Sequence, residues 1–236
     1  MMVSDFHSHV LPAIDDGSAS VEESLEMLRL EGQQGVPRVV ATPHFYARRD
    51  RLDDFLCRRE KAEALLRQEM AGKGDFPELI LGAEVHFFKG MSQTEQLREL
   101  ALKGTKAVLI EMPYGEWTEE MYRELAQIPE RLDLQPIIAH IDRYIRPFHK
   151  NENLTQMLQL PVMLQANTSF FLERKTGRMA MRMLAREQIQ LLGSDCHNLT
   201  KRPPNLQSAT DKICDKLEDI CLRQIIENEN QILTEK

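Results

Sequence analysis

The sequence has few cysteines, and none is spaced as a thiol metal site requires. Its four cysteines contain no Cys-x-x-Cys pair. Their arrangement argues against a disulfide framework and against a cysteine-rich zinc site. Glycine and proline are also sparse, at 11 residues each among 236, and no Gly/Pro/Ser-rich linker divides the chain. We therefore expect one ordered globular domain spanning residues 1–236.

Long apolar runs and an excess of basic residues are missing as well. No apolar segment approaches the roughly 20 residues that a membrane-spanning helix needs, and the first residues lack the charged start and apolar stretch of a signal peptide. We expect a cytoplasmic protein with no membrane insertion. The formal net charge of -7 disfavours nucleic acid as a partner, because phosphate binding normally leaves a basic excess on the domain. The sequence indicates no particular oligomeric state.

Short apolar runs alternate with longer amphipathic segments along the chain. This alternation predicts parallel strands buried on both faces, with helices between them. Seven alternations in one domain favour an α/β barrel, and a doubly wound open sheet is the alternative. The predicted strands are 3–6, 38–41, 79–81, 107–110, 136–139, 162–165 and 189–192. The predicted helices are 20–34, 52–70, 118–132, 151–158 and 176–187, followed from 205 by one long or two short helices.

A His-x-His pair, His7 and His9, follows the first predicted strand. Side chains two residues apart in a strand share a face, so this pair suits a metal chelate, although two solvent-facing histidines are an equally plausible interpretation of the pair alone. Other metal-competent side chains follow most of the other strands. In a barrel, such strand ends gather at one mouth. These side chains are Asp16 in the loop after the first strand, then His44, Glu84, Glu111, His140, Asp195 and His197.

Each of these residues alone is more often a surface carboxylate, a helix cap or a buried core histidine. Together, so many histidines and carboxylates at one mouth would be electrostatically unfavourable without bound cations. Mixed imidazole and carboxylate ligands suit Mn, Fe or Zn. Carboxylates also bridge neighbouring cations in two-metal hydrolytic sites. The pattern therefore predicts a metal cluster.

The order of these residues resembles the polymerase and histidinol phosphatase (PHP) superfamily, and their flanking residues narrow the resemblance. The segments around them are similar to those of the CpsB/CapC-type manganese-dependent tyrosine phosphatases of bacterial capsule and exopolysaccharide synthesis. The resemblance runs from residue 2 to about residue 235. It implies a distorted seven-stranded barrel around up to three metal ions. The similar segments are 11–18, 41–44, 82–84, 110–113, 139–143 and 194–204.

The resemblance also implies a ligand set for each ion, with manganese favoured and iron or zinc possible. The first ion takes His7, His9, Glu84 and Asp195; the second takes Glu84, Glu111 and His140; the third takes Asp16, His44 and His197. Glu84 is the implied bridge. Segment 165–169 resembles the end of the family's sixth strand and offers no ligand, so we interpret it as a site wall.

Such a cluster supports phosphomonoester hydrolysis, because metals lower the pKa of bound water toward about 7 and a bridging hydroxide can then attack phosphorus. Arg143 and Arg202 are the predicted phosphate-binding residues, since guanidinium groups make bidentate contacts; surface salt bridging is the competing interpretation. The expected substrate is a phosphotyrosine protein, specifically the C-terminal tail of a bacterial tyrosine kinase that controls polysaccharide assembly. The run 48–51 is typical of a solvated face, yet at a barrel mouth it would attract an anionic substrate.

Three alternatives remain open at this point. The first is a small-molecule phosphatase of the same superfamily, such as one acting on histidinol phosphate. The second is a non-catalytic, metal-bound module that holds the kinase tail. The third uses Cys196 and Arg202, whose Cys-x5-Arg spacing is that of cysteine-based tyrosine phosphatases. The third is disfavoured because the intervening residues include no glycine to let backbone amides wrap a phosphate.

Overall fold

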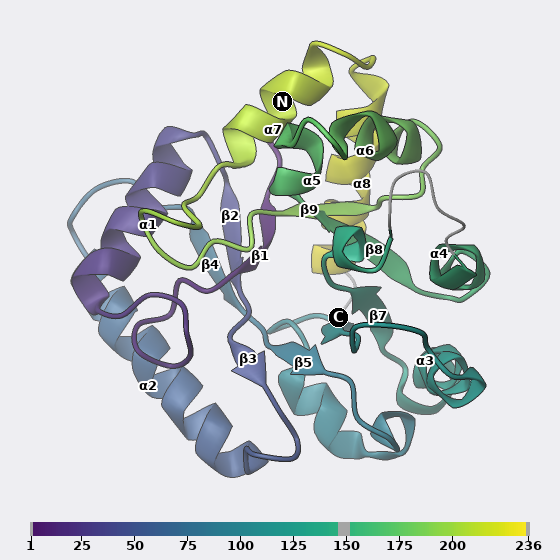
Figure 1. Cartoon of the computed structure of the whole chain (residues 1–236). Coiled ribbons are helices and arrows are strands. Elements are labelled where there is room, and N and C mark those ends of the chain that lie inside the picture. The colour runs from purple at the N-terminus through teal and green to yellow at the C-terminus, as the bar shows by residue number, and fades with distance from the viewer. Residues whose placement is uncertain (1, 146–151, 235–236) are drawn as a thin grey trace.

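The computed structural model describes residues 2–145 and 152–234, and within them every strand pairing is parallel (Figure 1). The strands fall into two sheets. The first sheet has the order β1 (Asp5–Ser8), β2 (Arg38–Ala41) and β4 (Glu78–Leu81). The second has the order β3 (His44–Phe45), β5 (Glu84–His86), β6 (Ala107–Glu111), β7 (Gln135–Ile138), β8 (Met163–Asn167) and β9 (Leu191–Gly193).

The two sheets form one curled surface. Two residues separate β2 from β3 and two separate β4 from β5, and Glu84 N still donates to Pro43 O at 3.0 Å across this break. At the other edge, Asp195 N donates to His7 O at 2.8 Å and His9 N donates to Cys196 O at 2.9 Å, which joins the end of β9 to β1. The prediction of a distorted α/β barrel is therefore confirmed, and the open-sheet alternative is wrong.

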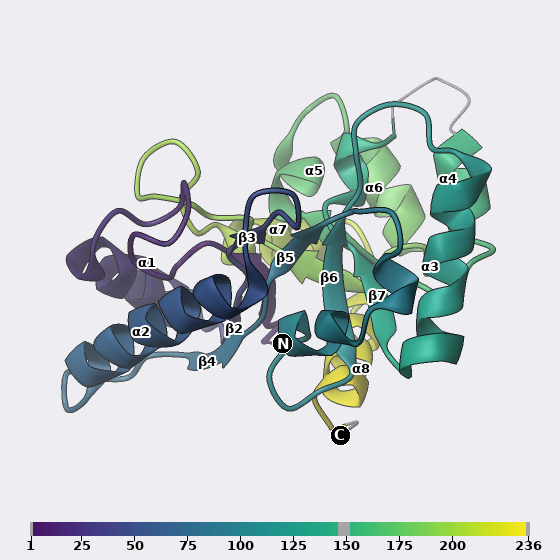
Figure 2. The same ribbon diagram turned by 90° about the horizontal axis from the view of Figure 1, so that it is seen from below.

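The helices surround the strands (Figures 1 and 2). α1 and α2 lie beside the β1–β2–β4 sheet, whereas α3 packs on β7 and α8 packs on β9. Of the two possibilities for the region from residue 205, two short helices are observed rather than one long helix. Residue 151, the first residue of the fourth predicted helix, lies outside the described residues. The bounds are α1 (Val21–Gln33), α2 (Leu52–Met70), α3 (Glu119–Leu132), α4 (Glu152–Met157), α5 (Thr168–Leu172), α6 (Gly177–Leu184), α7 (Leu206–Cys214) and α8 (Ile220–Thr234), with short 3-10 helices at Met91–Gln93, Glu95–Leu100 and Ile141–Arg143.

The first helix shows how local sequence sets these bounds. Ser20 is its N-cap, and the Ser20 hydroxyl oxygen accepts a hydrogen bond from Glu23 N at 3.2 Å. Glu23 in turn accepts from Ala19 N at 2.8 Å, one residue earlier than a standard capping box. Gly35 has a φ of 78°, a left-handed conformation that stops the helix without the strain of a side chain. The predicted start and end of this helix are confirmed.

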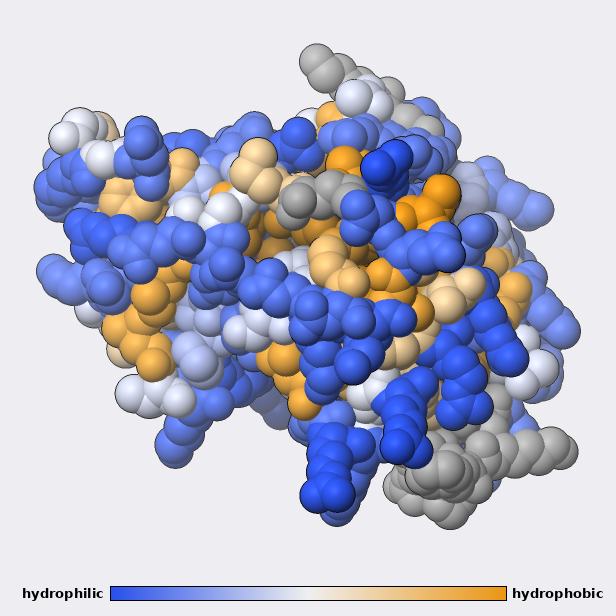
Figure 3. Space-filling view, turned by 90° about the horizontal axis from the view of Figure 1, so that it is seen from above, coloured by the Kyte–Doolittle hydropathy of each residue, from blue (hydrophilic) through white to orange (hydrophobic). Residues whose placement is uncertain are grey.

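Most of the strand residues are buried, and all five residues of β6 are. A second, smaller apolar cluster joins Phe6, Val40, Leu109 and Leu191 with Ile232 of α8. Among the helices that the structure describes, none is long and apolar enough to span a membrane. The face seen from above is largely hydrophilic, and its apolar side chains are interrupted by charged ones (Figure 3).

Candidate metal centre

His7 and His9 lie at the end of β1 and are almost completely buried. Their Nε2 atoms are 3.2 Å apart. On the opposite side of each ring, Nδ1 is engaged: His7 Nδ1 lies 3.2 Å from Gln165 Oε1, and His9 Nδ1 lies 2.7 Å from Asp15 Oδ2. These contacts fix the ring orientations, so both Nε2 atoms face one point.

Glu84 is the carboxylate at the middle of the cluster. It follows the break between β4 and β5, and only 1% of its surface is exposed. Its Oε2 atom lies 3.3 Å from His7 Nε2, 3.4 Å from His9 Nε2 and 2.8 Å from His44 Nδ1. Its Oε1 atom lies 2.7 Å from His140 Nε2. One carboxylate thus contacts four histidines from three segments of the chain.

Asp195 approaches the same point from the residues after β9. Its Oδ1 atom lies 3.6 Å from His7 Nε2 and 3.5 Å from His9 Nε2, and its Oδ2 atom accepts from Asn167 Nδ2 at 2.9 Å. Asp195 has a φ of 53° and His140 a φ of 33°, which are costly conformations for residues other than glycine. Backbone strain at two clustered polar residues is typical of a functional site.

A second group of side chains lies at the outer side of the cluster. Asp16 Oδ1 is 3.4 Å from His44 Nε2 and 3.6 Å from His197 Nε2. Together with His9, these three residues offer ligand atoms that all lie within 4.8 Å of one another. The Asp16 side chain is 69% exposed, so this group is the one most open to solvent.

Glu111 completes the cluster at the end of β6. Its Oε1 atom lies 3.5 Å from His140 Nε2, and its Oε2 atom lies 3.1 Å from Nδ1 of His86. Ligand atoms of Glu111, Glu84 and His44 also lie within 4.8 Å of one another. All nine side chains predicted as ligands are therefore brought together at the carboxyl ends of the strands.

The donor set fits bound cations. Two polar atoms in the cluster are buried and lack a hydrogen-bond partner among the described residues: His140 Nδ1 and His197 Nε2. A buried polar atom without a partner is costly, at about 1 to 3 kcal/mol. A cation held between imidazole nitrogens and carboxylate oxygens satisfies such atoms, and this mixture suits Mn, Fe or Zn.

The protonation states of the side chains in the cluster also suit bound cations. Burial alone raises the pKa of Glu84, but the charge of His7 and hydrogen bonds from His140 and His44 hold it well below its ordinary value. Burial is likewise outweighed at Glu111, where hydrogen bonds from His140 and His86 lower the pKa to about 2. Burial lowers the pKa of His197 to about 4, and charges on His9 and Arg202 act in the same direction. At neutral pH these carboxylates are ionised and His197 is neutral.

Both predicted phosphate-binding arginines lie at the cluster. Nη2 of Arg143 forms an ion pair with Oδ2 of Asp195, and Arg143 Nη1 lies 3.5 Å from Glu111 Oε1. Arg202 Nη2 lies 2.5 Å from the same Asp195 oxygen. Their side chains remain 25% and 39% exposed, so both guanidinium groups retain a face toward solvent.

Cys196 does not have the environment of a nucleophile. It is fully buried, and its Sγ lies 4.0 Å from Glu31 Oε1. Burial and the charges of Glu31 and Asp5 raise the pKa of the thiol well above its ordinary value. A reactive thiolate needs an exposed, electropositive setting. The Cys-x5-Arg interpretation is therefore wrong.

Several supporting residues were not predicted from the sequence. Asp15 accepts from His44 N at 3.0 Å in addition to contacting His9, and Gln165 accepts from His140 N at 2.7 Å. In the sequence, the only indication that Asp15 belongs to the site is its position next to Asp16. Gln165 was predicted only as part of segment 165–169, a wall of the site. A Cβ on Gly193 would lie 2.6 Å from His7 Cβ and 2.7 Å from Gln165 Nε2, so this position behind His7 requires glycine.

The fold and the cluster together define a distorted parallel α/β barrel with a candidate metal centre at the carboxyl ends of its strands. The chain belongs to the CpsB/CapC family of capsular polysaccharide synthesis, whose model matches residues 3–234. It is 30% identical to the tyrosine-protein phosphatase CpsB of Streptococcus pneumoniae over 224 residues, covering 90% of each chain. It is 27% identical to CpsB of Streptococcus agalactiae, covering 97% of each chain.

Solved structures show the same fold. One, from work on YwqE of Bacillus subtilis and CpsB of Streptococcus pneumoniae, "unique metal-dependent tyrosine phosphatases", superposes with a TM-score of 0.84 at 22% identity, covering 98% of this chain and 94% of the other. A variant of organophosphorus hydrolase superposes more loosely, with a TM-score of 0.53 at 13% identity and with coverage of 99% and 97%. The predicted PHP-type barrel agrees with the superposition on the YwqE and CpsB structure.

Proposed function

We propose that this protein is a metal-dependent protein-tyrosine phosphatase. The observation that carries this proposal is the convergence of nine histidine and carboxylate side chains, two of them with buried atoms that lack a partner among the described residues, beside two arginines. Relatives similar over almost the whole chain are named tyrosine-protein phosphatases. The proposal treats the chain as a single catalytic domain.

The ligand assignment in this proposal follows the three predicted sets. His7, His9, Glu84 and Asp195 would hold the first ion, Glu84, Glu111 and His140 the second, and Asp16, His44 and His197 the third. Manganese is the favoured metal, while iron and zinc suit the same donors. The central position of Glu84, with each carboxylate oxygen near different histidines, supports its role as the bridge.

Bound metal ions would lower the pKa of a water molecule and neutralise charge on the phosphoryl oxygens. The protein's own contribution is orientation and charge. Asp15 and Gln165 fix the rings of His9 and His7, while Arg143 and Arg202 bind phosphoryl oxygens with the guanidinium edges that face solvent. A phenolate leaving group has a pKa near 10, so phosphotyrosine requires less protonation of the departing oxygen than an alkyl phosphate does.

The proposed substrate is phosphotyrosine in a protein, specifically the tail of a bacterial tyrosine kinase that regulates capsule or exopolysaccharide synthesis. The family's role in capsular polysaccharide synthesis supports this context. A cytoplasmic location is part of the same proposal, because it would place the enzyme beside such a kinase domain.

The proposal is tested with metal-stripped protein to which Mn, Fe, Zn or Mg is restored singly. We expect hydrolysis of a phosphotyrosyl peptide to return with at least one metal, and to exceed hydrolysis of histidinol phosphate. His44→Ala and His197→Ala should abolish turnover, whereas Arg143→Ala and Arg202→Ala should mainly raise KM. Peptide binding without turnover at every metal would favour a non-catalytic module, and preferential hydrolysis of histidinol phosphate would favour a small-molecule phosphatase.

A further inference from the structure

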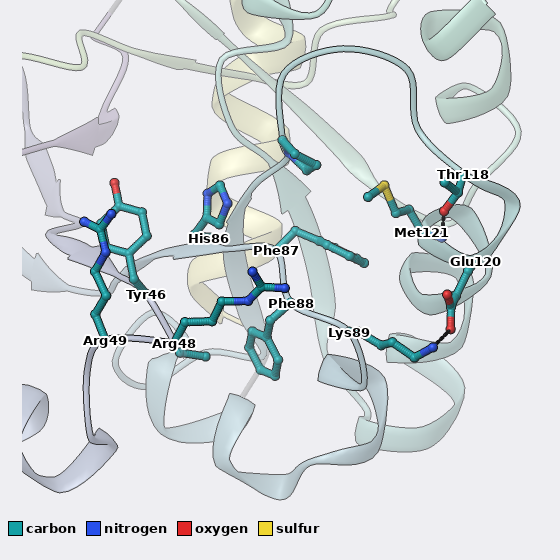
Figure 4. A pocket seen from close by; sticks show the side chains of 12 residues that line it. Tyr46, Arg48, Arg49, His86, Phe87, Phe88, Lys89, Thr118, Glu120 and Met121 are labelled. Carbon is teal, nitrogen blue, oxygen red and sulfur yellow. Dashed lines mark hydrogen bonds and ion pairs between the residues drawn. The ribbon is translucent and has the colours of Figure 1, made fainter.

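A pocket of about 570 Å³ lies beside the candidate metal centre (Figure 4). We call it the Arg48 pocket. One wall comes from the segment between β3 and α2, a second from the end of β5 and the residues after it, and a third from the start of α3. Its lining includes Arg48 and Arg49 on the first wall, Phe87 and Phe88 on the second, and Met121 on the third.

The pocket shares a wall with the metal centre. The ring of Tyr46 lies 5.4 Å from the ring of His44 on one side and 5.4 Å from the ring of His86 on the other. His86 also contacts Glu111 through Nδ1 at 3.1 Å. Tyr46 and His86 therefore line the pocket and adjoin the metal centre at the same time.

The first wall of the pocket carries net positive charge. Two carboxylates that follow in the sequence pair with other arginines: Asp50 with Arg58 at 3.0 Å and Asp54 with Arg51 at 3.8 Å. Within the part of the chain that the structure describes, no carboxylate forms an ion pair with Arg48 or Arg49. On the far side, Lys89 is neutralised by Glu120 at 2.7 Å.

The two arginines are placed to bind an anion in the pocket. The guanidinium carbon of Arg49 lies 5.2 Å from the centre of the Tyr46 ring, a cation–π contact that restricts its side chain. Arg48 extends across the pocket in Figure 4. On the other two walls, Phe87, Phe88 and Met121 supply an apolar surface for side-chain carbons. Positive charge beside apolar side chains suits a peptide with an acidic residue.

We propose that the Arg48 pocket binds an acidic residue next to the phosphotyrosine of the substrate protein, so that the enzyme prefers acidic phosphotyrosyl segments. This inference rests on the proposed phosphatase function and adds a sequence preference to it. The charge complementarity of Arg48 and Arg49, and the continuity of their pocket with the metal centre, carry the inference.

Two phosphotyrosyl peptides of equal length test it, one with glutamates flanking the phosphotyrosine and one with glutamines there. We expect wild-type kcat/KM to be about fivefold to tenfold higher for the glutamate peptide, because each exposed ion pair contributes up to about fivefold. In Arg48→Gln/Arg49→Gln this ratio should fall to about one, and salt should reduce the wild-type ratio. A ratio between two peptides does not depend on how much of the variant is folded.

Arg51→Gln is the matched control, because Arg51 belongs to the same segment but does not line the pocket. It should keep the wild-type ratio. Arg48→Glu/Arg49→Glu should invert the preference toward a peptide with flanking lysines. A wild-type ratio near one, or a ratio that survives loss of both arginines, overturns the inference while leaving the phosphatase intact. Failure of wild-type enzyme to hydrolyse either peptide contradicts the proposed function instead.

Discussion

Individual residues of the cluster are held by contacts on the side that faces away from it. Nδ1 of His7 and His9 is engaged by Gln165 and Asp15, which leaves the Nε2 atoms directed at Glu84 and Asp195. Immediately beside this arrangement, Cys196 lies with its sulfur against Glu31. The two neighbours Asp195 and Cys196 thus have separate roles: one joins the cluster and the other is part of the packing behind it.

Cys196→Ser should therefore retain activity. Serine is similar in size and its hydroxyl can donate to Glu31, so we expect kcat/KM toward a phosphotyrosyl peptide to stay within about threefold of wild type, since the sulfur has no part in catalysis. The measurement is steady-state kinetics at saturating metal, with metal content determined alongside. His197→Ala serves as the inactive comparison. Complete loss of activity in Cys196→Ser with metal content unchanged would contradict this assignment.

At the scale of elements, sequence patterns were enough to locate most strands and helices. Short apolar runs gave seven of the nine strands that the structure describes, and the predicted helices 20–34 and 118–132 begin at the observed N-cap residues, Ser20 and Thr118. β3 and β5 were missed, because these two short strands, His44–Phe45 and Glu84–His86, contain polar ligand-type residues and so show no apolar run. The three-residue β9 was found because it overlaps the longer apolar run 189–192. They follow Pro43 and Ala83, where the chain bends from one sheet into the other.

The missed strands carry two of the predicted ligands, His44 and Glu84, and these residues were still predicted correctly as part of the cluster. The reason is topological: the carboxyl ends of parallel strands meet at one edge whether or not a strand is broken. Contacts between side chains from distant segments, such as those that Gln165 and Asn167 of β8 make with His140 and Asp195, leave no periodic signal. They follow from the tertiary structure alone.

The next prediction concerns Asp15, in the loop between β1 and α1. Its side chain contacts residues at the end of β1 and at the start of β3. Its carboxylate accepts from Gly17 N at 2.9 Å, from His44 N at 3.0 Å, and contacts His9 Nδ1 at 2.7 Å. Asparagine has one acceptor oxygen for these three partners. Asp15→Asn should weaken metal affinity by about 10-fold to 100-fold, the usual effect of removing a residue that orients a ligand.

Titration of metal-stripped protein with Mn measures this affinity. Asp133→Asn is the matched control, because Asp133 is an exposed residue at the end of α3 that pairs with Lys106. Its metal affinity should equal that of wild type. An unchanged affinity in Asp15→Asn would show that the rings of His9 and His44 are held without this carboxylate.

At the scale of the whole molecule, the two ends of the described chain are joined by one buried carboxyl group. Glu229 of α8 is 1% exposed and accepts hydrogen bonds from Ser4 N at 3.0 and 3.1 Å. Burial raises the pKa of Glu229 to about 8, and the hydrogen bonds to Ser4 offset this only in part. The start of β1 and the C-terminal helix are therefore held together across a group that titrates near neutral pH.

This group makes stability depend on pH in a specific direction. An unfolded glutamate ionises near 4.5 and the folded Glu229 near 8, so between these values the native state binds more protons than the unfolded state. The free energy of unfolding should fall as pH rises through this window, by roughly 3 to 5 kcal/mol from this group.

Glu229→Gln cannot ionise, so its stability relative to wild type should increase from pH 5 to pH 8. Urea unfolding at several pH values measures the difference. Glu227→Gln, on the exposed side of the same helix, should follow the wild-type pH dependence. If Glu229→Gln and wild type fall in parallel, the buried carboxyl group is not the source of the slope.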